Sequence, residues 1–462
     1  MTNWTPNLAE RQGPRYLAIA EQLARDLEAG RLKPGERLPT HRDLAWKLGV
    51  TVGTITRAYA EAERRGLIAG EVGRGTFIRD RAIDTPPPAP QAVADDDFID
   101  LARNFPVAER PSESIIRAIT DAANSPDLGT MMGYAPNLGL PQHRAAGVEW
   151  LARHGLRTSV NEVAVCNGAQ HGAMLAMAAT ARAGDVVLTE QLTFYGMKSI
   201  ATLLGLRLHG VAMDEYGLIP EALETACRQN APKALYCIPT LQNPTAAIMP
   251  AERREVIAEI CRRHGVLIVE DDIYGFLSDD SPPPLASYIP DNSIFVTSLS
   301  KCVAPGLRVG YVKAPPPILE RIGSALRATT WMGTPLMAEI AARLVRSGDA
   351  ARLAEGQRAE AVARQAIAAR CLASYEVATH PSSFHLWLTL PEPWRREEFT
   401  LLARRRGVGV APAEAFAVGR APVPHAVRIG LSAARDRTQL ERALTVIADL
   451  LREPPDRGLA MV

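Results

Sequence analysis

The sequence predicts a layered α/β fold with a mainly parallel sheet, preceded by a small module of helices and a hairpin. Two observations support this prediction. After residue 98, short apolar runs alternate with helical stretches, which is typical of a parallel sheet covered by helices. A proline-rich segment separates this pattern from a shorter N-terminal stretch whose apolar residues follow helical spacing. At about 150 residues per domain, a chain of 462 residues allows about three folding units.

The N-terminal module shows three helical patterns. Apolar residues recur at three- and four-residue steps from Leu17 to Leu27 and predict a first helix. Thr40 and Thr51 are expected to cap two further helices. Two short apolar runs then flank a Gly-Arg-Gly turn at 73–75. Two helices split by a glycine turn and followed by a glycine-tipped hairpin are the layout of a winged helix-turn-helix.

A composition change marks the boundary between the module and the rest of the chain. Residues 81–97 read RAIDTPPPAPQAVADDD. Proline removes an amide donor and favours extended backbone, so this segment is predicted to be a linker. The predicted domains are therefore the module at 11–80, the linker at 81–97 and a larger domain at 98–455.

The larger domain contains six runs with the composition of buried strands. They read VNEVAVC, DVVLTE, KALYCIP, GVLIVEDD, SIFVTS and RVGYVKA. Helices such as Ala169–Ala183 and Ala251–His264 are expected between them. From about Pro335 onwards helical patterns dominate, and the runs SFHLWLTL and VRIGLS predict a smaller α+β lobe. The predicted architecture is a large lobe with a mainly parallel sheet and a smaller second lobe.

The overall composition excludes some classes of protein. With 52 Lys and Arg against 51 Asp and Glu, the formal charge is +1, which excludes a globally basic coat protein and a globally acidic tail. The sequence shows no apolar stretch long enough for a membrane span, and its polar beginning predicts no secretory signal. The six cysteines have no C-x-x-C spacing, so neither a metal cage nor a disulfide framework is expected. The expected location is therefore a reducing cytoplasm.

One lysine follows a strand in a context that suggests chemistry. Ser298-Leu299-Ser300-Lys301 comes directly after the run SIFVT, and Arg308 lies seven residues later. A lysine at a strand end, with hydroxyls and an arginine nearby, suits a Schiff-base lysine beside a phosphate site. A surface lysine in a serine-rich loop is the alternative interpretation.

Three other strand ends carry polar residues. Asn167-Gly168-Ala169-Gln170 forms a strand-to-helix turn, where bare backbone amides and the helix dipole favour an anion. Asn243 follows the strand KALYCIP and presents an amide. Glu270-Asp271-Asp272 ends the apolar run GVLIV, where buried carboxylates need a cation or a hydrogen-bond donor. A Mg²⁺ site is the rival interpretation of that acidic cluster.

Taken in order, these motifs resemble fold-type I enzymes that use pyridoxal 5′-phosphate (PLP), the aspartate aminotransferase superfamily. The resemblance extends from about Asp100 to Arg428. It rests on the motifs Tyr134-x4-Gly139-x4-Arg144, Asn167-Gly168-Ala169-Gln170, Asn243-Pro244, Asp271-x2-Tyr274 and Ser298-x-Ser300-Lys301-x6-Arg308-x-Gly310-Tyr311. The resemblance implies a fold-type I PLP-dependent transferase fold with PLP as its cofactor.

The resemblance implies a role for each matching residue. Lys301 would form the Schiff base with PLP and act as a proton-shuttling base once displaced. Asp271 would pair with the pyridine nitrogen, which makes the ring an electron sink. Asn243 and Tyr274 would contact the ring oxygen O3′, so that Lys301, Asp271 and Tyr274 form the catalytic set. The residues implied for the phosphate cup are Gly168, Ala169, Gln170, Ser298, Ser300 and Arg308.

Two further residues match positions that bind across subunits or bind substrate. Tyr134 resembles the tyrosine that reaches the phosphate from a neighbouring subunit, which implies a homodimer. Arg428 matches the arginine that forks onto a substrate α-carboxylate, a geometry that lysine does not provide.

The chain departs from the family pattern at several positions. Phe194 aligns with the aromatic residue that stacks on the ring, but Leu192 replaces the usual proline and Tyr195 follows. The choice between Phe194 and Tyr195 as the stacking residue is therefore open. His143 stands where the family usually has leucine, and Ser382-Ser383 replaces the usual glycine pair.

Residues 11–80 resemble the GntR-type winged helix-turn-helix through GRLKPGERLPTHRDLAWKLGV and EVGRGTFI. The resemblance implies DNA contacts from Arg42 on the first motif helix, Thr51 and Thr54 at the start of the recognition helix, and Arg74 on the wing. Val52-Gly53 stands where relatives often carry arginine and asparagine, so the base preference is not predicted.

A GntR-type module joined by a proline-rich linker to an aminotransferase-like domain resembles the MocR branch of that regulator family. The resemblance implies a PLP-dependent transcription regulator in the cytoplasm. It would bind a double-stranded DNA operator as a homodimer, often with subunits crossed head-to-tail, and would sense PLP or an amino compound. The alternative is an active aminotransferase, converting an amino acid to a 2-oxo acid, that carries a DNA-binding module. The sequence keeps every residue that transamination needs and does not separate the two.

Overall fold

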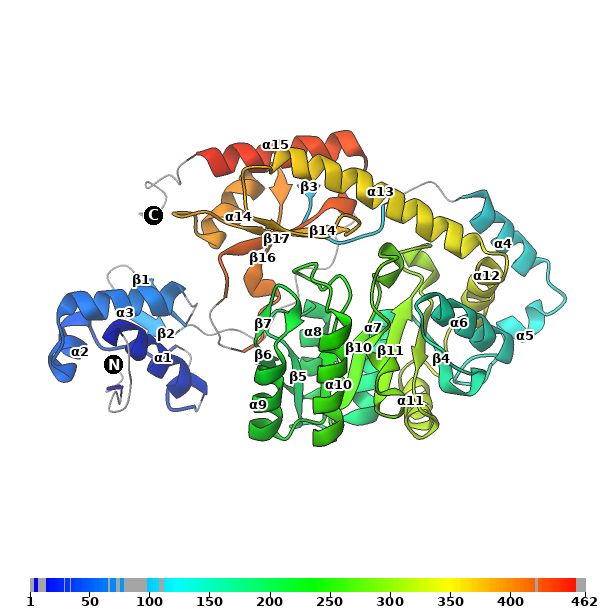
Figure 1. Cartoon of the computed structure of the whole chain (residues 1–462), viewed down its shortest axis with the longest axis horizontal. Coiled ribbons are helices and arrows are strands. Elements are labelled where there is room, and N and C mark those ends of the chain that lie inside the picture. Colours follow the sequence, from blue (N-terminus) through cyan, green and yellow to red (C-terminus); the bar gives the residue numbers. More distant parts are fainter. Residues whose placement is uncertain are drawn as a thin grey trace. The chain divides into compact units, whose positions relative to one another are not determined.

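The computed structural model describes residues 4–6, 14–28, 30–33, 35–64, 67–71, 75–78, 98–107, 112–419 and 423–453. The chain divides into two compact units, Met1–Thr85 with Val418–Pro424, and Pro86–Ala417 with His425–Val462. Figure 1 follows the chain through both units from blue to red. The predicted linker at 81–97 lies outside the described residues.

The N-terminal unit has the elements of the predicted winged helix-turn-helix. Its helices are α1 (Arg15–Glu28), α2 (His41–Leu48) and α3 (Val52–Arg64), and its antiparallel hairpin pairs β1 (Ile68–Glu71) with β2 (Gly75–Ile78). As predicted, Thr40 caps α2, because its hydroxyl accepts the amide hydrogen of Asp43 at 3.2 Å. Gly49 ends α2 with a left-handed φ of 62°, a conformation that glycine adopts without strain.

The second unit is built on a seven-stranded sheet in the order β4-β12-β11-β10-β9-β5-β6. Only β12 is antiparallel to its neighbours, so the sheet is mainly parallel, as the sequence predicts. The strands are β4 (Val163–Cys166), β5 (Val186–Glu190), β6 (Arg207–Val211), β9 (Ala234–Cys237), β10 (Leu267–Asp271), β11 (Ser293–Ser298) and β12 (Gly310–Lys313).

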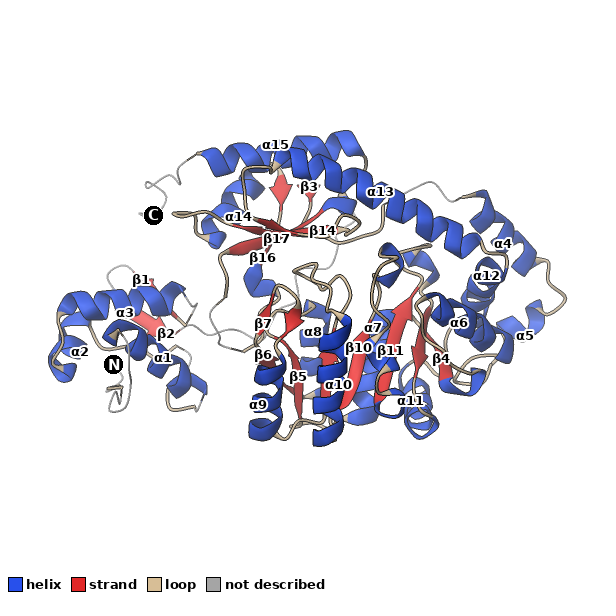
Figure 2. Cartoon of the chain, viewed as in Figure 1, coloured by secondary structure: helices blue, strands red, loops and turns tan. Residues whose placement is uncertain are grey.

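Helices cover both faces of this sheet (Figure 2). They are α6 (Pro141–Arg153), α7 (Ala169–Thr180), α8 (Tyr195–Leu204), α9 (Pro220–Asn230), α10 (Ala251–His264), α11 (Pro316–Thr329) and α12 (Pro335–Arg346). Successive strand residues point into different cores: Tyr236 joins the cluster beneath α7 and α11, whereas Leu235 joins the one beneath α9 and α10. This double burial explains why the central strands read as continuous apolar runs.

A smaller lobe follows, with a four-stranded antiparallel sheet in the order β13-β14-β17-β16. Its strands are β13 (Val377–Ala378), β14 (His385–Thr389), β16 (Ala411–Pro412) and β17 (Ala426–Gly430), and its helices are α13 (Asp349–Cys371), α14 (Arg396–Arg405) and α15 (Arg437–Arg452). The segment 98–107 belongs here, because β3 (Ile99–Asp100) pairs with β15 (Val408–Gly409) and Leu101 enters the same core.

The remaining elements are α4 (Glu113–Ala123), α5 (Leu128–Met132) and the short pair β7 (Met213–Asp214) and β8 (Gly217–Leu218). Within the described part of the chain, no helix has the length and apolar character needed to cross a membrane.

Arg254 anchors the loop that follows β9. It lies on α10 and is fully buried. Its guanidinium donates to the carbonyl oxygens of Pro239 at 3.1 Å and Pro283 at 3.0 Å, and to the hydroxyl of Thr240 at 2.9 Å. The carboxylate of Glu270 lies 3.9 Å away. One cation therefore ties a helix, a strand end and two loops together.

We expect Arg254→Met to lower the free energy of unfolding by about 3 kcal/mol, because it leaves buried acceptors unpaired beside the Glu270 carboxylate. Urea unfolding followed by circular dichroism measures the change. The matched control is Arg262→Met on the same helix, where the side chain is 52 % exposed and pairs with Glu259. That variant should shift the free energy by less than about 1 kcal/mol. Equal losses in the two variants would contradict the anchoring role.

Candidate functional site

Lys301 follows β11 and is partly buried. Its ammonium donates a hydrogen bond to the backbone carbonyl oxygen of Asn104. Burial, together with the positive charges of Arg428 and Arg308, lowers the pKa of Lys301 to about 7. A large fraction of the amine is therefore neutral near pH 7, which is the form that attacks an aldehyde.

Asp271 ends β10, the strand next to β11. The Tyr236 hydroxyl donates to its Oδ2 at 2.6 Å, while Oδ1 is buried and has no hydrogen-bond partner. Burial raises the pKa of Asp271 to about 7, although the hydrogen bond from Tyr236 opposes the shift. The free oxygen calls for a cationic or N–H donor from a ligand, since none of the described residues supplies one.

The neighbouring carboxylates have other partners. Glu270 accepts the amides of Leu285 at 3.0 Å and Ala286 at 2.7 Å. Asp272 accepts the amide of Gly275 at 2.6 Å. Within the residues that the structure describes, no group of three His, Cys, Asp or Glu side chains is placed to hold a metal ion.

The predicted anion site lies at the start of α7. Gly168 precedes that helix with a φ of 85° and provides no side-chain cap. A Cβ atom at Gly168 would lie 2.8 Å from the guanidinium of Arg308, so this backbone turn and Arg308 are close together. The buried hydroxyl of Ser300 has no partner. A helix N-terminus, an arginine and a free hydroxyl suit a phosphate group.

The other predicted cup residues lie around this turn. Ala169 and Gln170 are the first residues of α7. The Gln170 amide donates to the carbonyl oxygen of Gly196 at 3.2 Å, and the Ser298 hydroxyl accepts the amide hydrogen of Ser300 at 3.4 Å.

Arg428 comes from the smaller lobe, on β17, and is fully buried. It donates to the Asn243 side-chain oxygen at 2.8 Å and to the carbonyl oxygen of Ala102. Its guanidinium carbon lies 4.8 Å from the ring centroid of Phe416, and its Nε has no hydrogen-bond partner. The structure thus brings Arg428 and Asn243 into contact.

Two aromatic residues compete for the ring-stacking position. The ring centroids of Phe194 and Tyr195 are 4.8 Å apart, and Tyr195 lies 6.1 Å from Phe416. Burial lowers the pKa of Arg428, and the nearby Tyr195 phenol partly offsets this shift. Phe194 packs instead beside Gln170, because a Cβ atom at Gly196 would lie within 2.3 Å of both side chains.

Tyr134 is not gathered into the site within one chain. It is 86 % exposed, and its ring packs against Trp331 with centroids 5.9 Å apart.

Sequence reasoning missed three buried residues that bond to the site. Tyr236 on β9 binds Asp271. Asn104 donates to the Tyr274 hydroxyl at 2.8 Å, and its side-chain nitrogen lies 3.0 Å from Nδ1 of His385 on β14. A histidine inside the apolar run SFHLWLTL was a signal that could have been used. The sequence around Asn104 carries no comparable signal, because Asn104 is nearly 200 residues from Lys301 in sequence.

The N-terminal unit presents its own polar surface. Arg42 is exposed on α2, and the Thr51 hydroxyl accepts the amide hydrogen of Thr54 at 3.2 Å, so Thr51 caps α3 as predicted. A hollow of about 350 Å³ at this helix start is lined by Arg15, Tyr16, Thr51, Gly53, Thr54 and Arg57. Sequence reasoning did not select Arg15 or Arg57. Arg74 lies outside the described residues.

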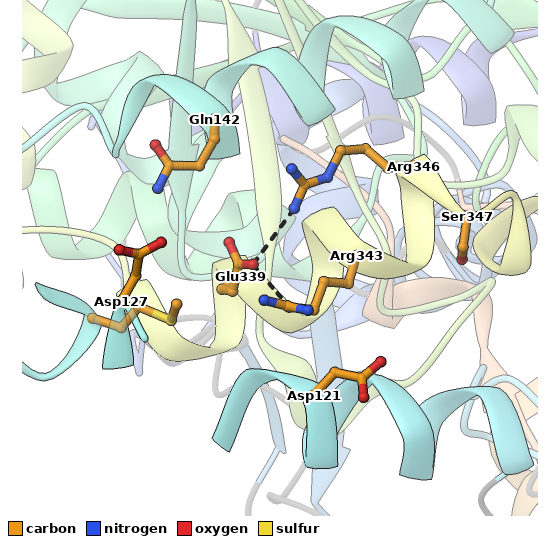
Figure 3. Close-up of a pocket in the computed structure, with 8 residues that line it drawn as sticks. Asp121, Asp127, Gln142, Glu339, Arg343, Arg346 and Ser347 are labelled. Carbon is orange, nitrogen blue, oxygen red and sulfur yellow. Dashed lines mark hydrogen bonds and ion pairs between the residues drawn. The ribbon is translucent and has the colours of Figure 1, made fainter. Parts of the chain in front are cut away.

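A larger hollow of about 680 Å³ lies between α4, α5, α6 and α12 (Figure 3). It contains none of the predicted site residues. Glu339 lines it and pairs with Arg343 at 2.8 Å, Arg346 at 3.5 Å and the buried His143 at 3.1 Å. His143, unusual for the family, is therefore the buried partner of a carboxylate.

Family models match both parts of the chain. Residues 15–78 match "Bacterial regulatory proteins, gntR family", and residues 96–447 match "Aminotransferase class I and II". The uncharacterized HTH-type transcriptional regulator YdeF of Bacillus subtilis is 32% identical over 456 residues, covering 97% of each chain. The HTH-type pyridoxine biosynthesis transcriptional regulator PdxR of Corynebacterium glutamicum is 28% identical over 69% of each chain.

Solved structures share the fold of the second unit. LysN, an α-aminoadipate aminotransferase from Thermus thermophilus, has a TM-score of 0.70 and 24% identity over 79% of this chain and 94% of its own. An archaeal alanine:glyoxylate aminotransferase has a TM-score of 0.71 and 22% identity over 77% of this chain and 91% of its own. The fold-type I aminotransferase domain indicates PLP as the cofactor. The chain belongs to the GntR-family regulators of the MocR type, in which a winged helix-turn-helix is joined to an aminotransferase class I and II domain.

Proposed function

We propose that this chain is a PLP-dependent transcription regulator. Its second unit, 98–455, holds PLP as a Schiff base on Lys301 and senses PLP or an amino compound, and its module at 11–80 binds operator DNA. The observation that carries the proposal is the pair of Lys301 and Asp271 at neighbouring strand ends, where burial brings both pKa values to about 7. A neutral amine and an unpartnered carboxylate oxygen are what an aldehyde on a pyridine ring requires.

The chain's residues have separate tasks toward the cofactor. When bound, PLP supplies an aldehyde that condenses with amines and a ring that withdraws electrons. Asp271 holds a proton on the ring nitrogen, and Asn243 and Tyr274 donate to O3′. The phosphate cup consists of Gly168, Ala169, Gln170, Ser298, Ser300 and Arg308. We assign ring stacking to Phe194 rather than Tyr195, because Phe194 lies toward the cup and Tyr195 toward Arg428.

Arg428 is the proposed anchor for the carboxylate of an amino-acid effector. It is buried, its Nε is unpaired, and two parallel N–H groups match a carboxylate. An effector amine that takes the place of the Lys301 amine would leave that side chain free. Carboxylate binding at Arg428 and release of the Lys301 amine would both change the hydrogen bonds of the segment 98–107. The reason is that the carbonyl oxygen of Ala102 accepts from Arg428 and that of Asn104 accepts from Lys301.

That segment belongs to the smaller lobe and directly follows the predicted linker at 81–97 in sequence. A change in its bonding is therefore the proposed start of the signal to the DNA-binding module. The size of the signal is limited to the difference in effector affinity between the two states of the protein.

A second candidate function is an active aminotransferase that converts an amino acid to a 2-oxo acid. What favours it is that Lys301, Asp271 and Tyr274 all match the residues to which the resemblance assigns catalysis. The bovine kynurenine/alpha-aminoadipate aminotransferase is 26% identical over 47% of this chain. Titrating the PLP protein with a panel of amino acids separates the two functions. Steady release of 2-oxo acid supports the enzyme, whereas altered operator affinity without release supports the sensor.

The proposed assembly is a cytoplasmic homodimer, with subunits crossed head-to-tail, on an operator with paired half-sites. Its support is the exposure of Tyr134, which would complete the phosphate cup of the neighbouring subunit. In the DNA module, the proposed contacts are Arg42, Thr51, Thr54 and Arg74.

Lys301→Ala should abolish the visible absorption band that the PLP protein develops, because the variant lacks the amine on which the proposed Schiff base forms. In the wild type, the rate of band formation after adding PLP should rise as pH increases through about 7, since only the neutral Lys301 amine reacts. Stopped-flow absorbance measures both effects. An unchanged band in Lys301→Ala would rule out this lysine.

Asp271→Asn should weaken PLP retention by tenfold or more while the fold is preserved. The amide keeps the shape and the bond to Tyr236 but loses the charge that pairs with a protonated ring nitrogen. Equilibrium dialysis against PLP gives the affinity. Retention equal to that of the wild type would refute the proposed role of Asp271.

Arg42→Ala should weaken operator binding about tenfold and reduce the salt slope by about one, because one phosphate contact is lost. Fluorescence anisotropy with labelled operator DNA at several salt concentrations measures both. The exposed Arg25 on α1 provides the matched control. If Arg25→Ala weakens binding as much as Arg42→Ala does, the loss reflects net charge and not a specific contact.

A further inference from the structure

A chain of hydrogen bonds connects Tyr274 to His385 through the side chain of Asn104, and the roles described above use neither His385 nor the Asn104 side chain. Asn104 is 6 % exposed and His385 is fully buried. They belong to separate parts of the fold: Asn104 to the segment 98–107, His385 to β14 and Tyr274 to the loop after β10. Such a network needs an explanation, because buried polar groups cost free energy unless they are satisfied.

The tautomer of His385 follows from its partners. Nε2 lies 3.0 Å from the backbone carbonyl oxygen of Gln242, and a carbonyl oxygen only accepts, so Nε2 carries the hydrogen. Burial and the charges of Arg428 and Lys301 lower the pKa of His385 to about 3, so the ring is neutral. A neutral imidazole has one N–H group, and Nδ1 is therefore an acceptor.

The orientation of Asn104 follows from that tautomer. An acceptor at Nδ1 requires a donor, so the amide nitrogen of Asn104, and not its oxygen, faces His385 at 3.0 Å. The same nitrogen donates its second hydrogen to the Tyr274 oxygen at 2.8 Å. The Asn104 oxygen turns away and accepts from the Ser432 hydroxyl at 3.4 Å. Reversing the amide would place an oxygen against the lone pair of Nδ1.

The direction of the Tyr274 hydroxyl follows in turn. Because its oxygen already accepts from Asn104, its own hydrogen is not shared with Asn104 and remains available to another acceptor. We propose that His385 and Asn104 are positioning residues that make Tyr274 a hydrogen-bond donor toward O3′ of PLP. This inference rests on the proposed Schiff base at Lys301 and extends it to the side chains of two residues, neither of which is proposed to contact PLP.

Simple packing is the competing explanation. The His385 ring lies 5.7 Å from the Tyr274 ring, and the Ser383 hydroxyl lies 3.5 Å from Nδ1 at the limit of a hydrogen bond. If His385 only fills space, an aromatic residue of similar size should replace it without consequence for the cofactor.

The test is a pH titration of the visible band of the PLP protein. In His385→Phe, Asn104 is free to reverse and accept the Tyr274 hydrogen, so O3′ loses a donor and the Schiff-base nitrogen becomes more basic. We expect the apparent pKa of the band to rise by about one unit. Asn104→Ala should raise it too, by less than His385→Phe does, because the Tyr274 hydroxyl is then free to rotate and points its hydrogen toward O3′ only part of the time. His385→Asn is the matched control, since its carbonyl oxygen can replace Nδ1 as the acceptor, and it should titrate near the wild-type value.

A double variant separates positioning from packing. Tyr274→Phe should raise the apparent pKa by itself, and adding His385→Phe should produce no further rise, because both changes remove the same hydrogen bond. Wild-type titration in both His385→Phe and Asn104→Ala would overturn the inference, as would fully additive shifts in the double variant. If the wild-type protein forms no band that depends on Lys301, the proposed function fails and this inference fails with it.

Discussion

The functional site depends on one constraint, the removal of ionisable side chains from water at the carboxyl edge of three adjacent parallel strands. β9, β10 and β11 are neighbours in the sheet, so the loop with Asn243, the end residue Asp271 and the following Lys301 meet at one edge. Burial then shifts the pKa of the acid upwards and that of the amine downwards, to about 7 in both cases. Each group is close to losing its charge, and a ligand that supplies a counter-charge or an electrophile relieves that cost.

The rest of the second unit holds this edge in place. Arg254 fixes the start of the loop that carries Asn243 through carbonyl and hydroxyl contacts. The smaller lobe delivers Arg428 and His385 from adjacent strands, β17 and β14, which are paired in the sheet. The site is thus made by two sheets and by the segment 98–107, and its residues are held by bonds that cross between them.

The sequence predicts the parts of this arrangement that are local. The six buried strands, the α7 and α10 helices and the caps at Thr40 and Thr51 follow from apolar spacing and short motifs, and the structure contains them. β6 was not predicted, because it lies at the sheet edge and its residues Arg207 and His209 break the apolar pattern. The ordered motifs also selected Asp271, Lys301 and Arg428, since each follows or occupies a recognisable strand.

The parts that escaped prediction are the long-range contacts. Tyr236 looks like any apolar strand residue, yet it determines which oxygen of Asp271 remains free. Asn104 bonds to residues 170 and 281 positions away, a separation at which local patterns carry no information. The tautomer of His385 depends on a carbonyl oxygen of Gln242, and no sequence pattern specifies where a backbone oxygen points.

The segment 98–107 explains how one fold can serve both a chemical site and a regulator. It adds a strand to the smaller lobe through β3, and its carbonyl oxygens at Ala102 and Asn104 accept from the two cations that a ligand would engage. A ligand that binds Lys301 or Arg428 must compete with these backbone acceptors, so occupancy and the bonding of this segment are linked in free energy. By reciprocity, if ligand binding changes the affinity for DNA by some factor, DNA binding changes the affinity for the ligand by the same factor.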